Sequence, residues 1–248
     1  MRTILKAALA TAAFAAVHSA LASLPVKRAA GKRIGDDRVD AGYRVFFVAQ
    51  SLLPFTGLVT YAAQLPSRTV YRVAGTAALP LRVGQLAGVL HLISGLRAIG
   101  FTRWAGLRHL QAWREGAPVP PGPAAQGPEM TDDGSLSAGG PFRCSRHPLN
   151  FSAIPIFWLT PHMTTRRLGF NLASTLYFIL GSVHEEARLR AAYGEAYVAY
   201  RERGIPFFLP FRLGGSRRAR AAEVSQATRL GTEPVKVPSG RFRRVAAG

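Results

Sequence analysis

Cysteine is nearly absent from this chain of 248 residues, which contains only Cys144. A single cysteine excludes an intrachain disulfide and any cysteine-rich metal site. We interpret Cys144 as an incidental or buried thiol rather than a nucleophile, and we expect no bound metal. The sequence shows no internal repeat.

Acidic residues are also scarce: 13 Asp and Glu residues stand against 32 Lys and Arg residues, and the formal net charge is +19. Such an excess would favour nucleic acid if it lay on one folded face. The cations fall mainly in the gaps between apolar runs instead, as they do in membrane proteins. We therefore expect no nucleic-acid partner.

Apolar residues are bunched, although their fraction of 48% is ordinary and the mean hydropathy of +0.09 is low for a membrane protein. The bunching predicts an all-α polytopic membrane protein with about five transmembrane helices. The last two apolar segments are at the lower length limit for a span. Buried helices of a soluble protein are the less favoured alternative, because five such segments follow one another. The segments are 4–24, 45–63, 79–96, 149–163 and 168–183.

Local features refine this prediction. The first segment resembles a signal peptide, with a basic start and small residues near its end. We expect it to be retained, because more apolar segments follow and His18 lies inside it. Gly84 and Gly88 have the small-xxx-small spacing that lets helices approach closely. Residues 161–167 are predicted to form a tight turn, so that the last two segments form a helical hairpin.

Loop charges predict the orientation of the chain. Basic residues are concentrated after the first and third segments and in the C-terminal part, whereas the opposite loops hold few. The positive-inside rule then places the N-terminus outside and the C-terminus in the cytoplasm. The abundance of Ala, Arg and Gly suggests a bacterial source. We expect an integral protein of the bacterial inner membrane, with its active site facing the cytoplasm.

The chain divides into four predicted regions. Residues 1–100 hold three transmembrane helices, and 101–140 form a cytoplasmic loop whose Pro-rich and Gly-rich part, 116–140, is predicted to be flexible. Residues 141–211 form a functional module with the hairpin and a cytoplasmic site. The basic tail, 212–248, is predicted to be disordered. The tail would be attracted to the anionic inner leaflet, or it is simply solvated.

Two ionisable clusters are the most informative motif. Arg146 and His147 precede Pro148, which suits the first turn of a helix. A helix N-terminus attracts anions, and Arg can bind a carboxylate through two hydrogen bonds. Glu185 and Glu186 end the next apolar segment and can meet an ammonium or a ribose hydroxyl. The spacing alone is equally compatible with an interfacial Arg and His and with solvated carboxylates.

A wider pattern favours the ligand site. The stretch 140–148, the Glu185-Glu186 pair, the segment Tyr193-Gly194-Glu195-Ala196-Tyr197-Val198-Ala199-Tyr200 and the stretch 205–210 follow one another at characteristic spacing. Together they resemble the C-terminal half of the isoprenylcysteine carboxyl methyltransferase-like membrane family, which phospholipid and methanethiol methyltransferases share. Residues 18–23, 26–28 and 43–46 are similar to its methanethiol methyltransferase and denitrification-associated branch.

The resemblance implies a cofactor, S-adenosylmethionine, at the cytoplasmic face. Arg146, His147, Pro148 and Asn150 would then lie at its amino-acid end, Glu185 and Glu186 would close the site, and Tyr197 and Tyr200 would flank it. Arg146 and Glu186 are the expected catalytic residues. Methyl transfer is an in-line displacement from an activated cofactor, so positioning matters most. The sequence departs from the family at Asn150 and Ser152, where the family has Tyr and Gly, which puts the substrate class in doubt.

Several alternatives stay open. The acceptor could be a small thiol, a prenylcysteine carboxylate or a lipid, and the N-terminal resemblance favours a small thiol or lipophile. A membrane reductase of the sterol type would use NADPH, for which no further phosphate-binding signature is found. A non-catalytic membrane protein is the third possibility. His18 and His91 either line a substrate cavity or are core histidines, and His184 is either a base for an amine acceptor or structural. The oligomeric state is not predicted.

Overall fold

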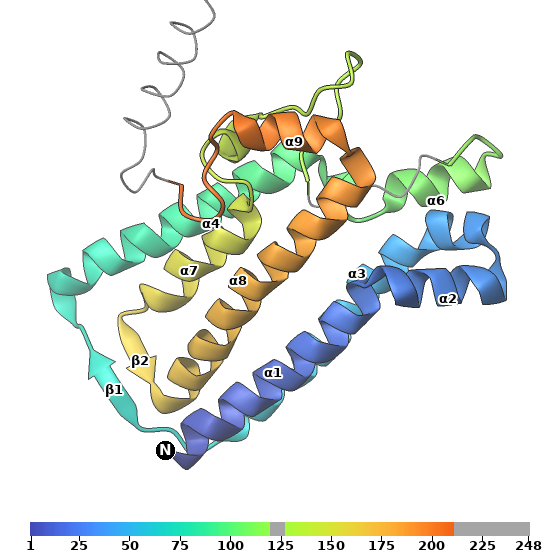
Figure 1. Cartoon of the computed structure of the whole chain (residues 1–248). Coiled ribbons are helices and arrows are strands. Elements are labelled where there is room, and N and C mark those ends of the chain that lie inside the picture. Colours follow the sequence, from blue (N-terminus) through green and yellow to red (C-terminus); the bar gives the residue numbers. More distant parts are fainter. Residues whose placement is uncertain (120–126, 211–248) are drawn as a thin grey trace, which may run out of the picture. The chain divides into compact units, whose positions relative to one another are not determined.

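The structure is a computed structural model that describes residues 1–119 and 127–210. The described part is mostly helical, as predicted (Figure 1). The predicted disordered tail, 212–248, and part of the predicted flexible loop, 120–126, lie outside the described residues. The longer elements are α1 (Arg2–Ala22), α2 (Leu24–Ile34), α3 (Asp36–Gln64), α4 (Leu79–Ile99), α6 (Leu107–Arg114), α7 (Pro148–Trp158), α8 (Thr165–Tyr193) and α9 (Glu195–Glu202). The short ones are β1 (Thr69–Arg72), η1 (Gly75–Ala78), α5 (Phe101–Trp104), η2 (Gly140–Arg143) and β2 (His162–Thr164).

Among the described residues, three helical stretches are long and apolar enough to cross a membrane: Arg2–Ala22, Asp36–Gln64 and Gly75–Ile99. They coincide with the first three predicted segments. Their outward faces carry large apolar side chains such as Leu53, 76% exposed, and Leu86, 57% exposed, as expected for contact with lipid. Pro54 lies inside α3, where a membrane helix tolerates it.

The prediction of five spanning helices is not confirmed. Helix α7 has 11 residues, and at a rise of about 1.5 Å per residue it is too short to cross alone. Helix α8 has 29 residues, and it is not among the three stretches with the apolar composition of a span. The orientation of the termini remains a prediction.

The helices pair through close approaches at glycine. A Cβ atom at Gly88 on α4 would lie 2.9 Å from Cγ of Pro155 on α7, so only glycine permits this approach. A Cβ atom at Gly84 would meet the side chain of Leu159. The close packing predicted from the Gly84 and Gly88 spacing is therefore confirmed, with α7 as the partner. Helix α7 also contacts α8, and α8 runs alongside α1 (Figure 1).

A two-stranded sheet replaces part of the predicted tight turn at 161–167. Strand β2 follows α7 and pairs antiparallel with β1, which follows α3. The backbone N–H of Thr165 donates to the carbonyl of Arg68 at 2.9 Å and extends this link. The sheet ties the α3–α4 connection to the α7–α8 connection. Strands of three and four residues are too short to produce an alternating pattern in the sequence, so the prediction missed them.

Residues 127–139, within the predicted flexible loop, make regular contacts. Met130 and Leu136 form an isolated β-bridge, and the hydroxyl of Thr131 closes the turn between them through the carboxylate of Asp133. Leu136 is buried against Leu189 at the end of α8 and the two tyrosines of α9. Residues 127–139 therefore help to fix α9 next to the polar end of α8.

Candidate functional site

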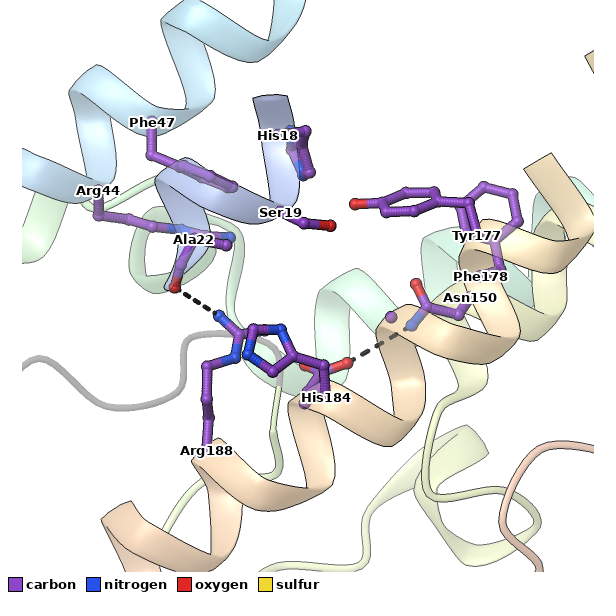
Figure 2. Close-up of a pocket in the computed structure, with 12 residues that line it drawn as sticks. His18, Ser19, Ala22, Arg44, Phe47, Asn150, Tyr177, Phe178, His184 and Arg188 are labelled. Carbon is purple, nitrogen blue, oxygen red and sulfur yellow. Dashed lines mark hydrogen bonds between the residues drawn. The ribbon is translucent and has the colours of Figure 1, made fainter. Parts of the chain in front are cut away.

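A pocket of about 150 Å³ opens between α1, α3 and α8, next to the N-terminal turn of α7 (Figure 2). Its charged end is formed by Arg44 on α3 and by Glu185 and Arg188 near the end of α8. One to two turns deeper along α1 and α8, the lining becomes aromatic. The lining residues are His18, Ser19, Ala22, Arg44, Phe47, Asn150, Tyr177, Phe178, Gly181, His184, Glu185 and Arg188.

The guanidinium of Arg188 has an unused donor at the charged end. Its Nη1 donates to the carbonyl of Ala22 at 3.1 Å. Its Nε is buried and has no hydrogen-bond partner in the described part of the chain. A buried donor without a partner costs about 1–3 kcal/mol, so this nitrogen is a natural contact for an acceptor on a ligand. The carboxylate of Glu185 lines the same pocket, which therefore offers both signs of charge.

Arg44 is fixed by its surroundings. Its Nε donates to the carbonyl of Trp104 at 2.6 Å. The guanidinium lies 5.5 Å from the ring centroid of Phe47 and 5.6 Å from that of Trp104, within cation–π distance. These contacts hold the cation at the wall of the pocket without neutralising its charge.

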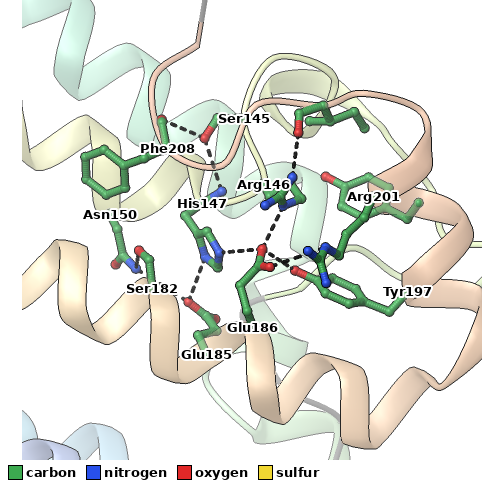
Figure 3. A network of polar contacts seen from close by, with 12 residues as sticks. Ser145, Arg146, His147, Asn150, Ser182, Glu185, Glu186, Tyr197, Arg201 and Phe208 are labelled. Atoms are coloured by element: carbon green, nitrogen blue, oxygen red, sulfur yellow. Dashed lines mark hydrogen bonds and ion pairs between the residues drawn. The ribbon is translucent and has the colours of Figure 1, made fainter. Parts of the chain in front are cut away.

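The two predicted clusters meet beside this pocket and form a network around Glu186 (Figure 3). Arg146 Nε donates to Glu186 Oε1 at 2.7 Å, and the Tyr197 hydroxyl donates to the same oxygen at 2.8 Å. His147 Nε2 lies 3.2 Å from it. Arg201 Nε lies 3.5 Å from Glu186 Oε2. Glu186 is thus contacted by partners from two segments, the residues just before α7 and helix α9.

The backbone before α7 positions this network. Pro148 begins the helix, and His147 is its N-cap residue. The N–H of Arg146 donates to the carbonyl of Pro206 at 2.9 Å, and its Nη1 donates to the carbonyl of Ile205 at 2.8 Å. Ser145 Oγ donates to the carbonyl of Phe208 at 2.8 Å. The stretch 205–210, which the sequence analysis singled out, therefore clamps the Arg-His-Pro element.

His147 joins the network to the pocket. Its Nδ1 is 3.2 Å from Oε2 of Glu185, while its Nε2 faces Glu186. A neutral imidazole has one N–H, so only the imidazolium can donate to both carboxylates. Burial alone would lower the pKa of His147, but the hydrogen bonds and charges of Glu185 and Glu186 outweigh it and raise that pKa above 6.5. This geometry and these charges favour the imidazolium form of His147, which holds Glu185 from the side away from the pocket.

The environment of Glu186 keeps it ionised. Burial alone would raise its pKa, but hydrogen bonds from His147, Arg146 and Tyr197 outweigh burial and lower the pKa to about 2. Burial and the bond to Glu186 raise the pKa of the Tyr197 phenol, which stays protonated as a donor. The positive charges of Arg146 and of protonated His147 balance the negative charges of Glu185 and Glu186. The net charge of these four groups is therefore zero, without counting Arg201.

The predicted site residues separate into two groups. Asn150 and Glu185 line the pocket, and Asn150 Nδ2 donates to Ser182 Oγ at 2.9 Å and to Glu185 Oε2 at 3.4 Å. The rest do not line it: Arg146, His147, Glu186 and Tyr197 form the network, while Pro148 and Tyr200 are buried beside it. The Tyr200 hydroxyl donates to the carbonyl of Phe142 at 2.9 Å. The expected catalytic pair, Arg146 and Glu186, thus lies behind the pocket wall.

Sequence reasoning missed the contribution of the N-terminal helices. Arg44 lies after the first predicted segment and Arg188 after the last, where basic residues were used only to predict the orientation, yet both line the pocket. His184 also lines the pocket, and it lies on the same face of α8 as Arg188 because the two are four residues apart. Of the two histidines inside apolar segments, His18 lines the pocket, whereas His91 lies at the α4–α7 contact with its Nδ1 2.7 Å from Ser152 Oγ. The isolated polar residues in apolar segments were the available signal.

The chain is similar to curated proteins named methanethiol S-methyltransferase. One from Pseudomonas deceptionensis is 35% identical over 83 residues, 34% of this chain and 31% of that protein. Methanethiol S-methyltransferase 2 from Bradyrhizobium diazoefficiens is 40% identical over 77 residues, 31% of this chain and 29% of that protein. A relative from Mycobacterium tuberculosis is 37% identical over 70 residues, 28% of each chain.

These matches confirm the resemblance to methanethiol methyltransferases over a limited stretch. The chain spans less than a third of the length of the curated relatives named above. No family model and no solved structure matches the chain.

Proposed function

We propose that the chain is an integral membrane methyltransferase that transfers a methyl group from S-adenosylmethionine to a small thiol. The observation that carries the proposal is the pocket. One end holds the guanidinium groups of Arg44 and Arg188 and the buried carboxylate of Glu185, and the other end is lined by aromatic rings. The similarity to methanethiol S-methyltransferases and the three apolar helices support the reaction class and the membrane setting.

The charged end of the pocket fits the amino-acid part of the cofactor. A carboxylate would accept from the unpartnered Nε of Arg188, and an ammonium would meet Glu185. The ring of Tyr177 or Phe47 would attract the sulfonium charge. The pocket volume of about 150 Å³ is below the range of about 300–1,000 Å³ for drug-sized ligands. We therefore assign only the amino-acid and sulfonium part of the cofactor to it.

The network residues act as positioning residues in this proposal. Arg146, Glu186 and Tyr197 fix His147, and His147 fixes the carboxylate of Glu185. This assignment replaces direct catalysis by Arg146 and Glu186, which the sequence favoured. When bound, the cofactor supplies an activated methyl group. The chain must align the acceptor with the methyl group and exclude water. The apolar rings of Phe47 and Phe178 line the pocket and would keep water away from the reacting atoms.

A small thiol is the acceptor that the pocket favours. The pocket of about 150 Å³ already receives the amino-acid and sulfonium part of the cofactor, so it leaves room only for a small acceptor beside the methyl group. The names of the relatives specify methanethiol as their acceptor. We place the protein in a bacterial inner membrane with the pocket at the cytoplasmic face, because basic residues gather at that end of the helices. The basic C-terminal part would contact anionic lipids there.

Binding of S-adenosylhomocysteine to the purified protein in detergent tests the cofactor. We expect the ligand to raise the Tm, because a ligand that binds only the folded state stabilises it. Arg188→Gln removes the unpartnered donor and should weaken binding at least tenfold. Arg190→Gln is the matched control, because Arg190 is exposed on α8 and does not line the pocket.

Other outcomes identify the competing functions. Stabilisation by NADPH without any effect of S-adenosylhomocysteine would contradict the proposal and favour a reductase. Absence of an effect from either ligand would favour a non-catalytic membrane protein. Equal binding of S-adenosylhomocysteine by the wild type and by Arg188→Gln would show that Arg188 does not contact the cofactor. The methyl-transfer assay would then decide the reaction class.

A further inference from the structure

A histidine lies at the aromatic end of the pocket, in an otherwise apolar helix. His18 is on α1, one turn before the helix ends at Ala22 (Figure 2). Its ring centroid lies 4.6 Å from that of Phe47, 5.6 Å from Phe14 and 6.1 Å from Tyr177. Three rings from α1, α3 and α8 therefore hold the imidazole in place. The network described above does not include it.

The hydrogen bonds of Ser51 favour one tautomer of His18, because the contact of its hydroxyl with the carbonyl of Phe47 is the shorter one. The hydroxyl of Ser51 donates its one proton to the carbonyl of Phe47 at 2.5 Å. Ser51 Oγ therefore acts as an acceptor toward its other neighbours. His18 Nδ1 lies 3.0 Å from this oxygen, so Nδ1 carries the proton and donates it.

The second ring nitrogen is then a free acceptor. With the proton on Nδ1, Nε2 of a neutral imidazole has an available lone pair. Nε2 makes no hydrogen bond within residues 1–119 and 127–210. His18 lines the pocket and Ser51 does not, so Nε2, on the edge away from Ser51, is the ring nitrogen available to a bound acceptor. A histidine oriented by a hydrogen bond at one nitrogen and free at the other is the arrangement of a general base.

The other titratable groups around the pocket come from two helices. Arg44 faces it from α3, and Tyr177, His184, Glu185 and Arg188 face it from α8. Glu185 is held by His147 and is assigned to the cofactor. Arg44 and Arg188 are cations at the charged end, so neither can accept the S–H proton. His18 remains as the uncommitted acceptor at the aromatic end.

We propose that His18 is the catalytic base for a small thiol acceptor, an inference that rests on the proposed function. The acceptor sulfur forms a bond to the methyl carbon while the bond between that carbon and the sulfonium sulfur of the donor breaks, and the bonding electrons stay with the departing sulfur. The S–H proton passes to Nε2 of His18, and its electrons remain on the acceptor sulfur. The products are a neutral thioether, S-adenosylhomocysteine and an imidazolium that returns its proton to solvent.

The variant His18→Asn tests this role. Asparagine keeps an N–H donor near the position of Nδ1, and hence the bond to Ser51, but it removes the basic nitrogen. With ethanethiol at neutral pH, we expect kcat to fall roughly 10²- to 10⁴-fold. The loss should shrink as the pH approaches the thiol pKa. It should also be small with thiophenol, which is already ionised at neutral pH. The Kd of S-adenosylhomocysteine should be unchanged.

His91→Asn is the matched control, because His91 also bonds a serine inside an apolar helix but does not line the pocket. Its pH profile should have the shape of the wild type. An equal loss for His18→Asn with ethanethiol and thiophenol at every pH would show a packing role and overturn the inference, as would full activity at neutral pH. Wild-type protein that binds S-adenosylhomocysteine but methylates no thiol would overturn the thiol acceptor and this inference together.

Discussion

At the scale of single residues, adjacent glutamates have separate roles. Glu185 lines the pocket and contacts one nitrogen of His147, whereas Glu186 accepts from Arg146, Tyr197 and the other nitrogen of His147. Consecutive helix residues point about 100° apart, so the two carboxylates reach different nitrogens of His147 and only Glu185 lines the pocket. The sequence placed both pairs at the cytoplasmic face as two sides of one ligand site, whereas in the structure they contact each other directly. It could not predict which carboxylate faces the pocket, because that depends on how α8 is rotated against α1.

Parallel substitutions of the two glutamates separate binding from stability. Glu186→Gln should destabilise the protein by about 3 kcal/mol, because it removes the negative charge that balances Arg146 and His147. Glu185→Gln should mainly weaken binding of S-adenosylhomocysteine. Tm in detergent and calorimetric Kd measure the two effects. These separate roles are contradicted if Glu186→Gln binds S-adenosylhomocysteine more weakly than Glu185→Gln does and keeps the wild-type Tm.

The charge on His147 gives stability a pH dependence. Its pKa in the folded protein is raised above 6.5, so its contribution is fully present below 6.5 and is lost as the pH rises through the folded value. Tm measured between about pH 6 and about pH 9 should therefore fall for the wild type. The fall should be smaller in His147→Gln, whose side chain does not titrate. Parallel curves for the two proteins would show that His147 is neutral.

At the scale of elements, the long apolar helices were predictable and the short elements were not. Helices α1, α3 and α4 follow from runs of apolar residues, and the approach of α4 to α7 follows from Gly84 and Gly88. Strands β1 and β2 are too short to carry a period and are formed by pairing with each other. The 11 residues of α7 could not be distinguished from a span, because apolar residues continue beyond its end at Trp158.

The contact between α4 and α7 should tolerate no side chain at Gly88. Gly88→Ala would place a Cβ atom 2.9 Å from Pro155 Cγ and 3.2 Å from the carbonyl oxygen of Ser152, so we expect destabilisation of about 1–3 kcal/mol. Gly57→Ala on α3 has nothing within 4 Å and should be neutral or stabilising, since Ala favours helix by up to about 1 kcal/mol. Thermal unfolding in detergent compares the two variants. Equal Tm values would mean that the helices do not approach so closely.

At the scale of the whole molecule, the pocket joins the two ends of the described sequence. His18 and Arg44 come from the N-terminal helices, and Asn150, Glu185 and Arg188 come from the C-terminal module. The resemblance indicated residues of the module because its motifs are dense there. It gave no roles to His18 or Arg44, because an isolated histidine in an apolar segment and one basic residue among several in a loop carry no spacing pattern. Their role depends on α8 packing against α1, which the sequence does not specify.

The topology can be tested with the native cysteine. Cys144 is the only cysteine in the chain, and it is exposed two residues before Arg146. If the site faces the cytoplasm, a membrane-impermeant maleimide should label Cys144 in inverted inner-membrane vesicles and not in intact spheroplasts. Cys144→Ser supplies the unlabelled control. Labelling in spheroplasts alone would reverse the predicted orientation.

The most direct test of the account is methyl transfer by the purified protein. The wild type in detergent is incubated with S-adenosylmethionine carrying a labelled methyl group and with ethanethiol, and labelled ethyl methyl sulfide and S-adenosylhomocysteine are quantified. The account predicts equal amounts of both products over many turnovers and a strongly reduced rate in Arg188→Gln. Absence of labelled thioether from protein that is folded and binds S-adenosylhomocysteine would contradict a thiol acceptor, and absence of both binding and transfer would contradict the methyltransferase.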